Sequence, residues 1–406
     1  MTVPKLYGWT KSLSLRAFLI AFVLTLVGLS VLGRWYSQQN PYPHFVRFHQ
    51  LISPETLYYP TISHLRAIAK EQLQDRDKIG VIVGGSSVLH GMSQPPDKIW
   101  TKDLQQRLGD RYRVINFAMA AGHVQGGGAI AAQSLLEEGY KIIYVSDIGL
   151  GMFFIFDGGE QYRYLLWDAL YKGLLKEYPP LFREINTTFN SSQLNELKLR
   201  MWLDSLFYFN DLWTTVGYKH FFTVWNSLIA RRSPLESFTK PRIQTLDTQI
   251  GYEPKPFPER FKAWEEIVKD LTKIEHNAIT TLCKNVYEWN DDQWVLKQTA
   301  FDTLNHQAQI TFPESFRRHI LLVIGSRNPY YFESLDPRYA ACWRQGNGMM
   351  ARQVRQAGYW AIELGSEFTG EDFNDNTHLL PSGGVKLAKV VAPKIEEMAV
   401  KQGYLK

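Results

Sequence analysis

Cysteine is scarce in this chain of 406 residues, which contains only Cys283 and Cys342. Two cysteines so far apart supply neither a disulfide framework nor a four-ligand zinc site. They leave two alternatives open, one disulfide between them or two buried free thiols. The chain also lacks any long block of lysine and arginine, and its net charge is a modest +5. Nucleic acid is therefore not an expected partner.

Charge is absent from residues 17–33, an apolar run at the short end of the lengths that cross a bilayer. Lys5, Lys11 and Arg16 precede this run without any acidic residue. The positive-inside rule then keeps the N-terminus in the cytoplasm and exports the rest of the chain. We expect an uncleaved signal anchor. A cleaved signal peptide is the rival interpretation, although the end of the run is a poor cleavage site.

Strands that alternate with helices are expected at both ends of the chain but not in its middle. Short apolar runs followed by helical periodicity occur in residues 76–156 and again in residues 316–406. This spacing is typical of a parallel sheet with crossover helices. Residues 157–315 lack the alternation, and their helical periodicity and many aromatic side chains predict a large, mainly helical insertion.

The expected strands are residues 79–83, 112–118, 140–147, 319–325 and 359–364. The expected helices are residues 63–74, 99–108, 126–138, 337–357 and 385–401, with 161–176, 193–230 and 258–288 in the insertion. The chain is thus divided into a cytoplasmic N-terminus (1–16), a transmembrane signal anchor (17–34), a stalk and lead-in (35–75), the first half of an α/β domain (76–156), the insertion (157–315) and the second half of the domain (316–406).

The stretch Gly84-Gly85-Ser86-Ser87 follows the first expected strand. Glycine lets the backbone turn sharply, and open parallel sheets place their chemistry at the carboxyl ends of the strands. Either serine could instead be a plain helix N-cap. This stretch alone leaves a nucleophile and a cap as equal alternatives.

A base for such a serine follows the last expected strand. His378 lies in that loop, and Asp375 stands three residues before it. Because parallel strands bring their carboxyl ends to one edge of the sheet, Ser87 and His378 can meet there. The aspartate can then orient the imidazole, as serine nucleophiles require. His90, on the same helix as Ser87, is the nearest competitor for the base, and a packing role suits it better.

These motifs resemble the sequence blocks of the SGNH (GDSL-type) hydrolase superfamily. Residues 85–91 read Gly-Ser-Ser-Val-Leu-His-Gly, similar to the first block Gly-Asp-Ser-x-x-x-Gly with Ser86 in place of the aspartate. The segment from Asn116 to Gly122 looks like the second block. Asp375 and His378, followed by a glycine at 383, look like the last block, Asp-x-x-His.

The third block departs from the family pattern Gly-x-Asn-Asp. Residues 144–147 read Tyr-Val-Ser-Asp, so Ser146 stands where the family has the asparagine of the oxyanion hole. The resemblance implies an SGNH-like, flavodoxin-like three-layer sandwich, with no cofactor and no metal. It implies the nucleophile Ser87, the base His378 and the orienting Asp375, with oxyanion or substrate-binding roles for Gly122, Asn116, Ser146 and His90.

The chain looks most like the membrane-anchored, exported branch of that family, which includes the D-alanyl-lipoteichoic-acid transfer proteins and the alginate-acetylation proteins. This resemblance implies an esterase or O-acyltransferase at the cell membrane, with its C-terminal domain on the periplasmic or extracellular side. The expected substrate is an envelope glycan or a lipid-linked acyl polymer, and a membrane acyl-donor protein is a candidate partner. The alternative is a non-catalytic carbohydrate-binding or scaffold protein on the same fold, favoured by the altered third block and the aromatic insertion.

Overall fold

The computed structural model describes most of the expected α/β domain and little of the expected insertion. The described residues are 15–37, 45–47, 62–119, 122–148, 165–166, 168–170, 172–177, 287–290, 293–325, 328, 337–365, 367–375 and 377–405. The helix predicted at residues 193–230 lies outside them, and so does the one predicted at 258–288 except for residues 287 and 288. Of the helix predicted at 161–176, residues 165–166, 168–170 and 172–176 are described, and the first five of these are helical.

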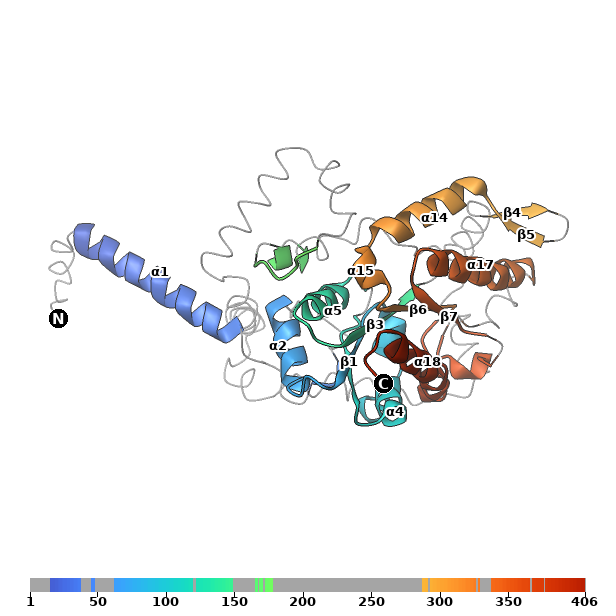
Figure 1. The fold of residues 1–406 in the computed structure, drawn as a ribbon, viewed down its shortest axis with the longest axis horizontal. Helices are drawn as coiled ribbons and strands as arrows, with labels where there is room; N and C mark the ends of the chain where they lie inside the picture. The colour runs from blue at the N-terminus through green and yellow to red at the C-terminus, as the bar shows by residue number, and fades with distance from the viewer. Residues whose placement is uncertain are drawn as a thin grey trace, which may run out of the picture.

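A five-stranded sheet forms the centre of the molecule (Figure 1), in the order β2-β1-β3-β6-β7. Its strands are β1 (Ile79–Val83), β2 (Tyr112–Asn116), β3 (Ile142–Ile148), β6 (Ile320–Ile324) and β7 (Trp360–Glu363). All neighbouring strands pair in parallel. The predicted α/β class with a parallel sheet is therefore confirmed, and each expected strand forms close to its predicted bounds.

Helices cover both faces of this sheet. One face carries α2 (Ile62–Gln72), α5 (Gly127–Glu137), α14 (Gln298–Ile310), α15 (Glu314–Arg317) and α17 (Pro337–Gln356), and the other carries α4 (Trp100–Leu108) and α18 (Pro381–Lys401). Successive strand side chains point to opposite faces. Ile82 therefore packs in the first core, and Val81 and Val83 pack in the second. This two-sided burial explains why the strands are apolar at nearly every position.

Helix α18 begins earlier than its apolar periodicity predicts. The sequence predicts a start at residue 385, but the helix starts at Pro381. Proline suits the first helical position, because its ring fixes φ and that position needs no N–H donor. The early start places the first turn of α18 directly behind the His378 loop.

A hairpin absent from the predictions joins the insertion to the second half of the domain. Strands β4 (Tyr287–Asn290) and β5 (Gln293–Leu296) pair antiparallel, and α14 follows them. The prediction of helix for residues 287–288 is therefore wrong. Tyr287 is buried and Glu288 is exposed, which is the period-two pattern of a strand. An alternation this short is hard to distinguish from helical periodicity.

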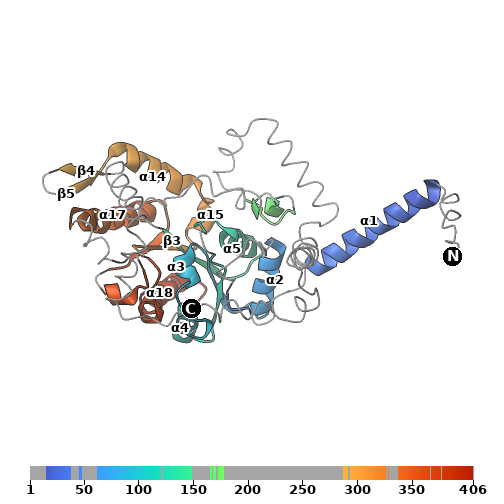
Figure 2. The same ribbon diagram turned by 180° about the vertical axis from the view of Figure 1, so that it is seen from behind.

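Helix α1 (Leu15–Ser37) contains the predicted anchor and extends away from the body of the molecule in both views (Figures 1 and 2). Many of its apolar side chains are exposed, among them Leu15 and Leu24 at 72% and 66%. No helix within the described residues is long and apolar enough to span a bilayer. The anchor role of residues 17–34 stays a prediction.

The order of the strands fixes where a ligand site is expected. The chain passes from β1 outward to β2 and then returns across β1 to β3. At such a reversal the two connections leave on opposite faces, so a crevice opens at the carboxyl ends of the strands. The turn after β1, which carries Ser87, lies at this reversal.

Candidate active site

The turn after β1 presents Ser87 at the start of the short helix α3 (Ser87–His90). Gly85, in this turn, has a φ of +90°, a conformation that favours glycine. A Cβ atom at Gly85 would also overlap the carboxylate of Asp147. Gly91 ends α3 in the left-handed conformation, with a φ of +75°. Both glycines of the predicted first block are therefore needed to place the serine.

Ser86 is held by Asp147, at the carboxyl end of β3. Its backbone N–H donates to Asp147 Oδ1 at 2.7 Å, and its hydroxyl donates to Asp147 Oδ2. Its Oγ in turn accepts the N–H of Val88 at 3.2 Å, as a helix N-cap does. The cap predicted for this stretch is therefore Ser86.

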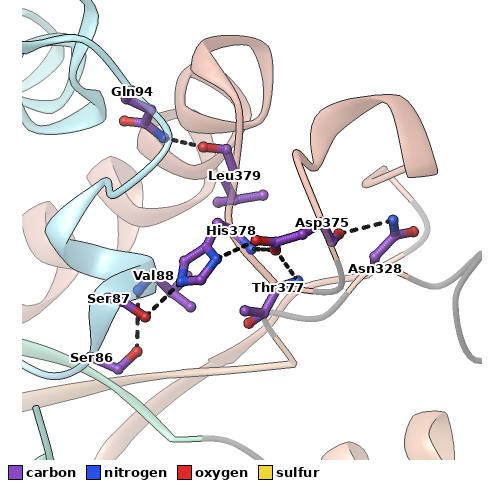
Figure 3. Close-up of polar contacts among 9 residues, drawn as sticks. All are labelled: Ser86, Ser87, Val88, Gln94, Asn328, Asp375, Thr377, His378 and Leu379. Carbon is purple, nitrogen blue, oxygen red and sulfur yellow. Dashed lines mark hydrogen bonds and ion pairs between the residues drawn. The ribbon is translucent and has the colours of Figure 1, made fainter. Parts of the chain in front are cut away.

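Ser87, His378 and Asp375 form one continuous hydrogen-bonded chain (Figure 3). Ser87 Oγ lies 2.8 Å from His378 Nε2, and His378 Nδ1 lies 2.6 Å from Asp375 Oδ2. An ionised carboxylate can only accept, so Nδ1 is the donor and the neutral ring keeps Nε2 as an acceptor. Nε2 therefore accepts the Ser87 hydroxyl, the arrangement that a general base requires.

Asp375 is kept ionised by its hydrogen bonds. Burial by itself would raise the pKa of this carboxyl, but the bonds donated by His378 and Thr377 outweigh it and hold the pKa below its usual value. The N–H groups of Thr377 and His378 donate to Asp375 Oδ1 at 2.9 and 2.7 Å. The side chains of His378 and Asp375 are 19% and 22% exposed, so the pair is shielded but within reach of a ligand.

The loop that carries Asp375 and His378 is closed by backbone hydrogen bonds. Phe373 and Leu379 form an antiparallel bridge, and the N–H of Asn374 donates to the carbonyl of His378 at 2.7 Å. Gly383, in the first turn of α18, lies against this loop, and a Cβ atom there would come within 2.8 Å of a Leu379 methyl group. Close packing accounts for the glycine that the predicted last block requires.

A buried carboxylate fixes the entry to the same loop. Asp372 is 3% exposed and accepts hydrogen bonds from the backbone and side chain of Thr369. Lys386, on α18, donates to Asp372 Oδ2 at 2.7 Å and to the carbonyl of Glu367 at 2.8 Å. Helix α18 thus contacts the loop that carries His378 in two places, through Lys386 where the loop begins and through Gly383 where it ends.

Two residues predicted for the oxyanion hole are engaged in the scaffold. Asn116 donates to the carbonyl of Leu89 at 3.2 Å and accepts the N–H of Ala118 at 3.1 Å. The N–H of Gly122 donates to the carbonyl of Met119 at 2.9 Å. These bonds do not match the predicted oxyanion roles. Gly122 is instead required by packing, because a Cβ atom there would overlap the carbonyl of Gly85.

Ser146 and His90 are both fully buried, at 0% exposure. Neither side chain is therefore accessible to a substrate in this structure, although the predicted substrate-binding roles require contact with one. No hydrogen bond from the N–H of Ser87 is found within the described residues, and its oxyanion role stays a prediction.

No protein-family model matches this chain, and a search of curated proteins finds no match. The SGNH resemblance therefore stays a prediction from the sequence blocks. The described residues contain no group of three His, Cys, Asp or Glu side chains placed to hold a metal ion.

Asp147 is a site residue that the sequence analysis missed in favour of its neighbour Ser146. Strand alternation carried the signal. Val145 packs in the same core as Val88 and Leu89 of α3, so Asp147, two positions on, points to that face as well. Ser146 points to the opposite face. Counting the alternation along β3 would have assigned Asp147 to the turn that carries Ser87.

Three other supporting side chains had no comparable sequence signal. Asn328 donates to the backbone carbonyl of Asp375 at 3.2 Å. Arg47 donates to carbonyls at the end of α3, and Gln94 donates to the carbonyl of Leu379 at 3.2 Å. Each is a single residue without a motif around it, and its partner lies far away in the sequence.

Proposed function

We propose that this protein is a serine esterase or O-acyltransferase of the SGNH type, with Ser87 as its nucleophile. The observation that carries this proposal is the hydrogen-bonded chain from Ser87 through His378 to Asp375. A serine hydroxyl is a poor nucleophile until a base takes its proton and a third group orients that base. A serine hydroxyl, an imidazole within hydrogen-bonding distance of it and a carboxylate at the other ring nitrogen are present in that order.

The proposed reaction follows from these positions. Ser87 Oγ attacks an acyl carbonyl carbon while His378 Nε2 takes the hydroxyl proton, and Asp375 stabilises the resulting imidazolium. The negative oxygen of the tetrahedral intermediate accepts the N–H of Ser87. As the intermediate collapses, His378 returns the proton to the leaving oxygen and an acyl-serine remains. Water or a sugar hydroxyl then attacks the acyl group, with His378 again as the base.

The arrangement of the sheet supports the finer fold assignment. Counted along the parallel strands alone, β2-β1-β3-β6-β7 is the order 2-1-3-4-5 of flavodoxin-like folds. In such folds the ligand lies at the reversal beside the first strand. The SGNH-like, flavodoxin-like sandwich with a large insertion is therefore our proposed fold.

We further propose an exported, membrane-anchored enzyme that acts on an envelope glycan or a lipid-linked acyl polymer, with a membrane acyl-donor protein as a candidate partner. The exposed apolar side chains of α1 and the basic residues before it support the anchor. Cys342 is disulfide-bonded, which favours an oxidising compartment outside the cytoplasm. If α1 is the anchor, the protein stays with membranes after alkaline carbonate washing. Recovery in the supernatant would contradict this part of the proposal.

The enzyme proposal is tested with a fluorophosphonate probe and with short acyl esters. We expect an adduct at Ser87 and ester turnover, both abolished in Ser87→Ala. Ser315→Ala is the matched control, because it removes an exposed hydroxyl on α15 and leaves the turn after β1 intact. Folded protein that forms no adduct at Ser87 would sink the proposal.

One observation favours a second candidate, a non-catalytic carbohydrate-binding or scaffold protein. Of the predicted oxyanion donors, Asn116 and Gly122 are bonded to the scaffold. An acyl-transfer enzyme with one donor would stabilise its intermediate less well. For this candidate, glycan binding persists in Ser87→Ala and no ester turnover is seen in the unsubstituted protein.

A further inference from the structure

The nucleophile and its base come from segments far apart in the chain, and Gln94 joins those segments by a second route. Its Nε2 donates to the carbonyl of Leu379 at 3.2 Å (Figure 3) and to that of Leu380 at 3.4 Å, and both residues directly follow His378. Its Oε1 accepts the backbone N–H of Trp100 at 2.8 Å. Both ends of the amide are thus occupied, and the side chain is only 2% exposed.

The backbone of Gln94 is tied in turn to the helix that carries Ser87. Its N–H donates to the carbonyl of Gly91 at 3.0 Å. Arg47 donates to the carbonyls of Gly91 and Gln94, the latter at 2.8 Å, and to that of His90 at 3.3 Å. A planar guanidinium holds several carbonyls in a fixed geometry. Movement of Gln94 relative to α3 is therefore restricted.

Packing leaves the Gln94 side chain little alternative space. A Cβ atom on Gly384, in the first turn of α18, would lie 2.7 Å from Gln94 Nε2 and 3.0 Å from Trp100 Cβ. The amide is thus wedged between α4 and α18. A buried amide that is packed on both sides cannot change its rotamer freely. It therefore holds the two segments that it contacts at a fixed separation.

We propose that Gln94 is a positioning residue that sets the separation of Ser87 and His378. It fixes the backbone after His378 to the turn after α3, so that the 2.8 Å contact between Oγ and Nε2 forms without the substrate. The catalytic consequence rests on the proposed function. The positional role does not, because the contact itself can be measured.

The test compares Gln94→Met, which keeps the length and removes the donor, with a matched control, Gln133→Met. Gln133 is 3% exposed on α5 and donates to the carbonyl of Glu177 at 2.9 Å, on the opposite face of the sheet. Three readouts are used on the full chain: the thermal midpoint, the pH profile of the fluorophosphonate labelling rate at Ser87, and the downfield NMR resonance of the His378 Nδ1 proton.

We expect Gln94→Met to label about 100-fold more slowly, the effect of a misplacement of roughly 1 Å. The pH dependence of labelling should change, and the Nδ1 resonance should shift or broaden. Gln133→Met should lose thermal stability and keep the other two readouts. Gln94→Glu, which keeps an acceptor for Trp100 but loses the donor, should behave like Gln94→Met and serves if that variant does not fold.

The outcomes separate this proposal from the proposed function. If Gln94→Met or Gln94→Glu folds, labels at the unsubstituted rate and keeps the Nδ1 resonance, the positioning role is overturned. If the unsubstituted protein never labels, the enzyme proposal fails and the resonance decides alone. A shifted resonance in the Gln94 variants then supports positioning, and an unchanged one overturns it.

Discussion

Two adjacent serines have different roles because their hydroxyl groups meet different acceptors. Ser86 donates to the carboxylate of Asp147 and caps α3. Ser87 donates to the imidazole of His378, whose other ring nitrogen is bonded to Asp375. A carboxylate is in general a much weaker base than an imidazole. The acceptor, and not the serine itself, therefore distinguishes the proposed nucleophile from the helix cap.

Asp375→Asn should show how much the reaction depends on the tautomer of His378. The asparagine keeps the shape, but its NH₂ group can face Nδ1 and favour the ring with its proton on Nε2. That ring cannot accept the Ser87 hydroxyl. We expect the labelling rate at Ser87 to fall by about 10⁴-fold, as for other triads that lose this carboxylate. Asp97→Asn, at an exposed position, should leave the rate unchanged.

The same variant should change the acid dependence of stability. The pKa of Asp375 is lower in the folded protein than its usual value, so on acidification the unfolded chain takes up the proton first. The stabilisation is then complete above about pH 4 and is lost as the pH falls through the folded-state pKa. We expect the difference in thermal midpoint between the unsubstituted protein and Asp375→Asn to shrink in acid. A difference that grew in acid would contradict this assignment.

At the scale of the elements, the turn between β1 and α3 is the most constrained connection. Gly85 and Gly139 have similar φ values, +90° and +88°, but only Gly85 has atoms in the way of a Cβ. Gly139→Ala should therefore cost about 1–2 kcal/mol, the strain of the left-handed backbone. Gly85→Ala should cost more, because the methyl group displaces the carboxylate of Asp147 and with it Ser86.

Urea denaturation and labelling distinguish these two glycines. We expect Gly139→Ala to lose stability and keep its labelling rate, whereas Gly85→Ala loses both. Equal losses of stability in the two variants would show that backbone strain alone decides, and that the turn tolerates the displaced carboxylate.

Near its C-terminus the chain packs against the residue that precedes β6, where Tyr404 contacts His319. His319 stacks on Tyr404, its Nδ1 lies 3.0 Å from the tyrosine oxygen, and its Nε2 accepts the Nε–H of Arg318 at 3.3 Å. Burial, and then the charge of Arg318, lower the pKa of His319 to about 4. The imidazole is therefore neutral in the folded protein. Protonation would place an N–H donor on Nε2, directly opposite the Nε–H donor of Arg318.

Stability should fall as the pH drops from about 6.5 towards 4, because the unfolded chain binds the proton that the folded chain excludes. His319→Gln should reduce this loss of stability between about pH 6.5 and 4, measured by urea unfolding at each pH. An equal loss in His319→Gln would rule out His319 as its cause.

Sequence patterns predicted the elements whose signal is local. The five parallel strands could be predicted because two-sided burial makes each a short apolar run. The hairpin of β4 and β5 could not, because its aromatic alternation is too short to distinguish from a helix. The triad could be predicted from the order of its motifs along the chain. Gln94 and Arg47 could not, since their acceptors are backbone carbonyls that only the folded chain brings near.

At the scale of the whole molecule, the site depends on bringing the two ends of the domain together. Ser87 and His378 are separated by 291 positions, and residues 157–315 lie between their two halves. Closing so long a loop costs conformational entropy. A covalent bond within the intervening chain removes part of that cost, because it restricts the unfolded state.

The disulfide at Cys342 is placed to do this. Cys342 is fully buried in α17, which packs on β6 and β7, and the other cysteine of the sequence, Cys283, lies outside the described residues. We expect non-reducing peptide mapping to find these two residues joined. The closed loop spans 342 − 283 = 59 positions, so its loss should cost about 4 kcal/mol of unfolding free energy in urea.

Substitution of either cysteine removes the same disulfide bond. Cys283→Ser, Cys342→Ser and the double variant should share most of their loss, and reduction of the unsubstituted protein should match it. The extra cost in Cys342→Ser is that of a buried hydroxyl. Additive losses in the double variant, or two titratable thiols in the denatured and unreduced protein, would show that the cysteines act separately. Matching losses would mean that the domain reaches full stability only in a compartment that oxidises thiols, as the proposed exported location requires.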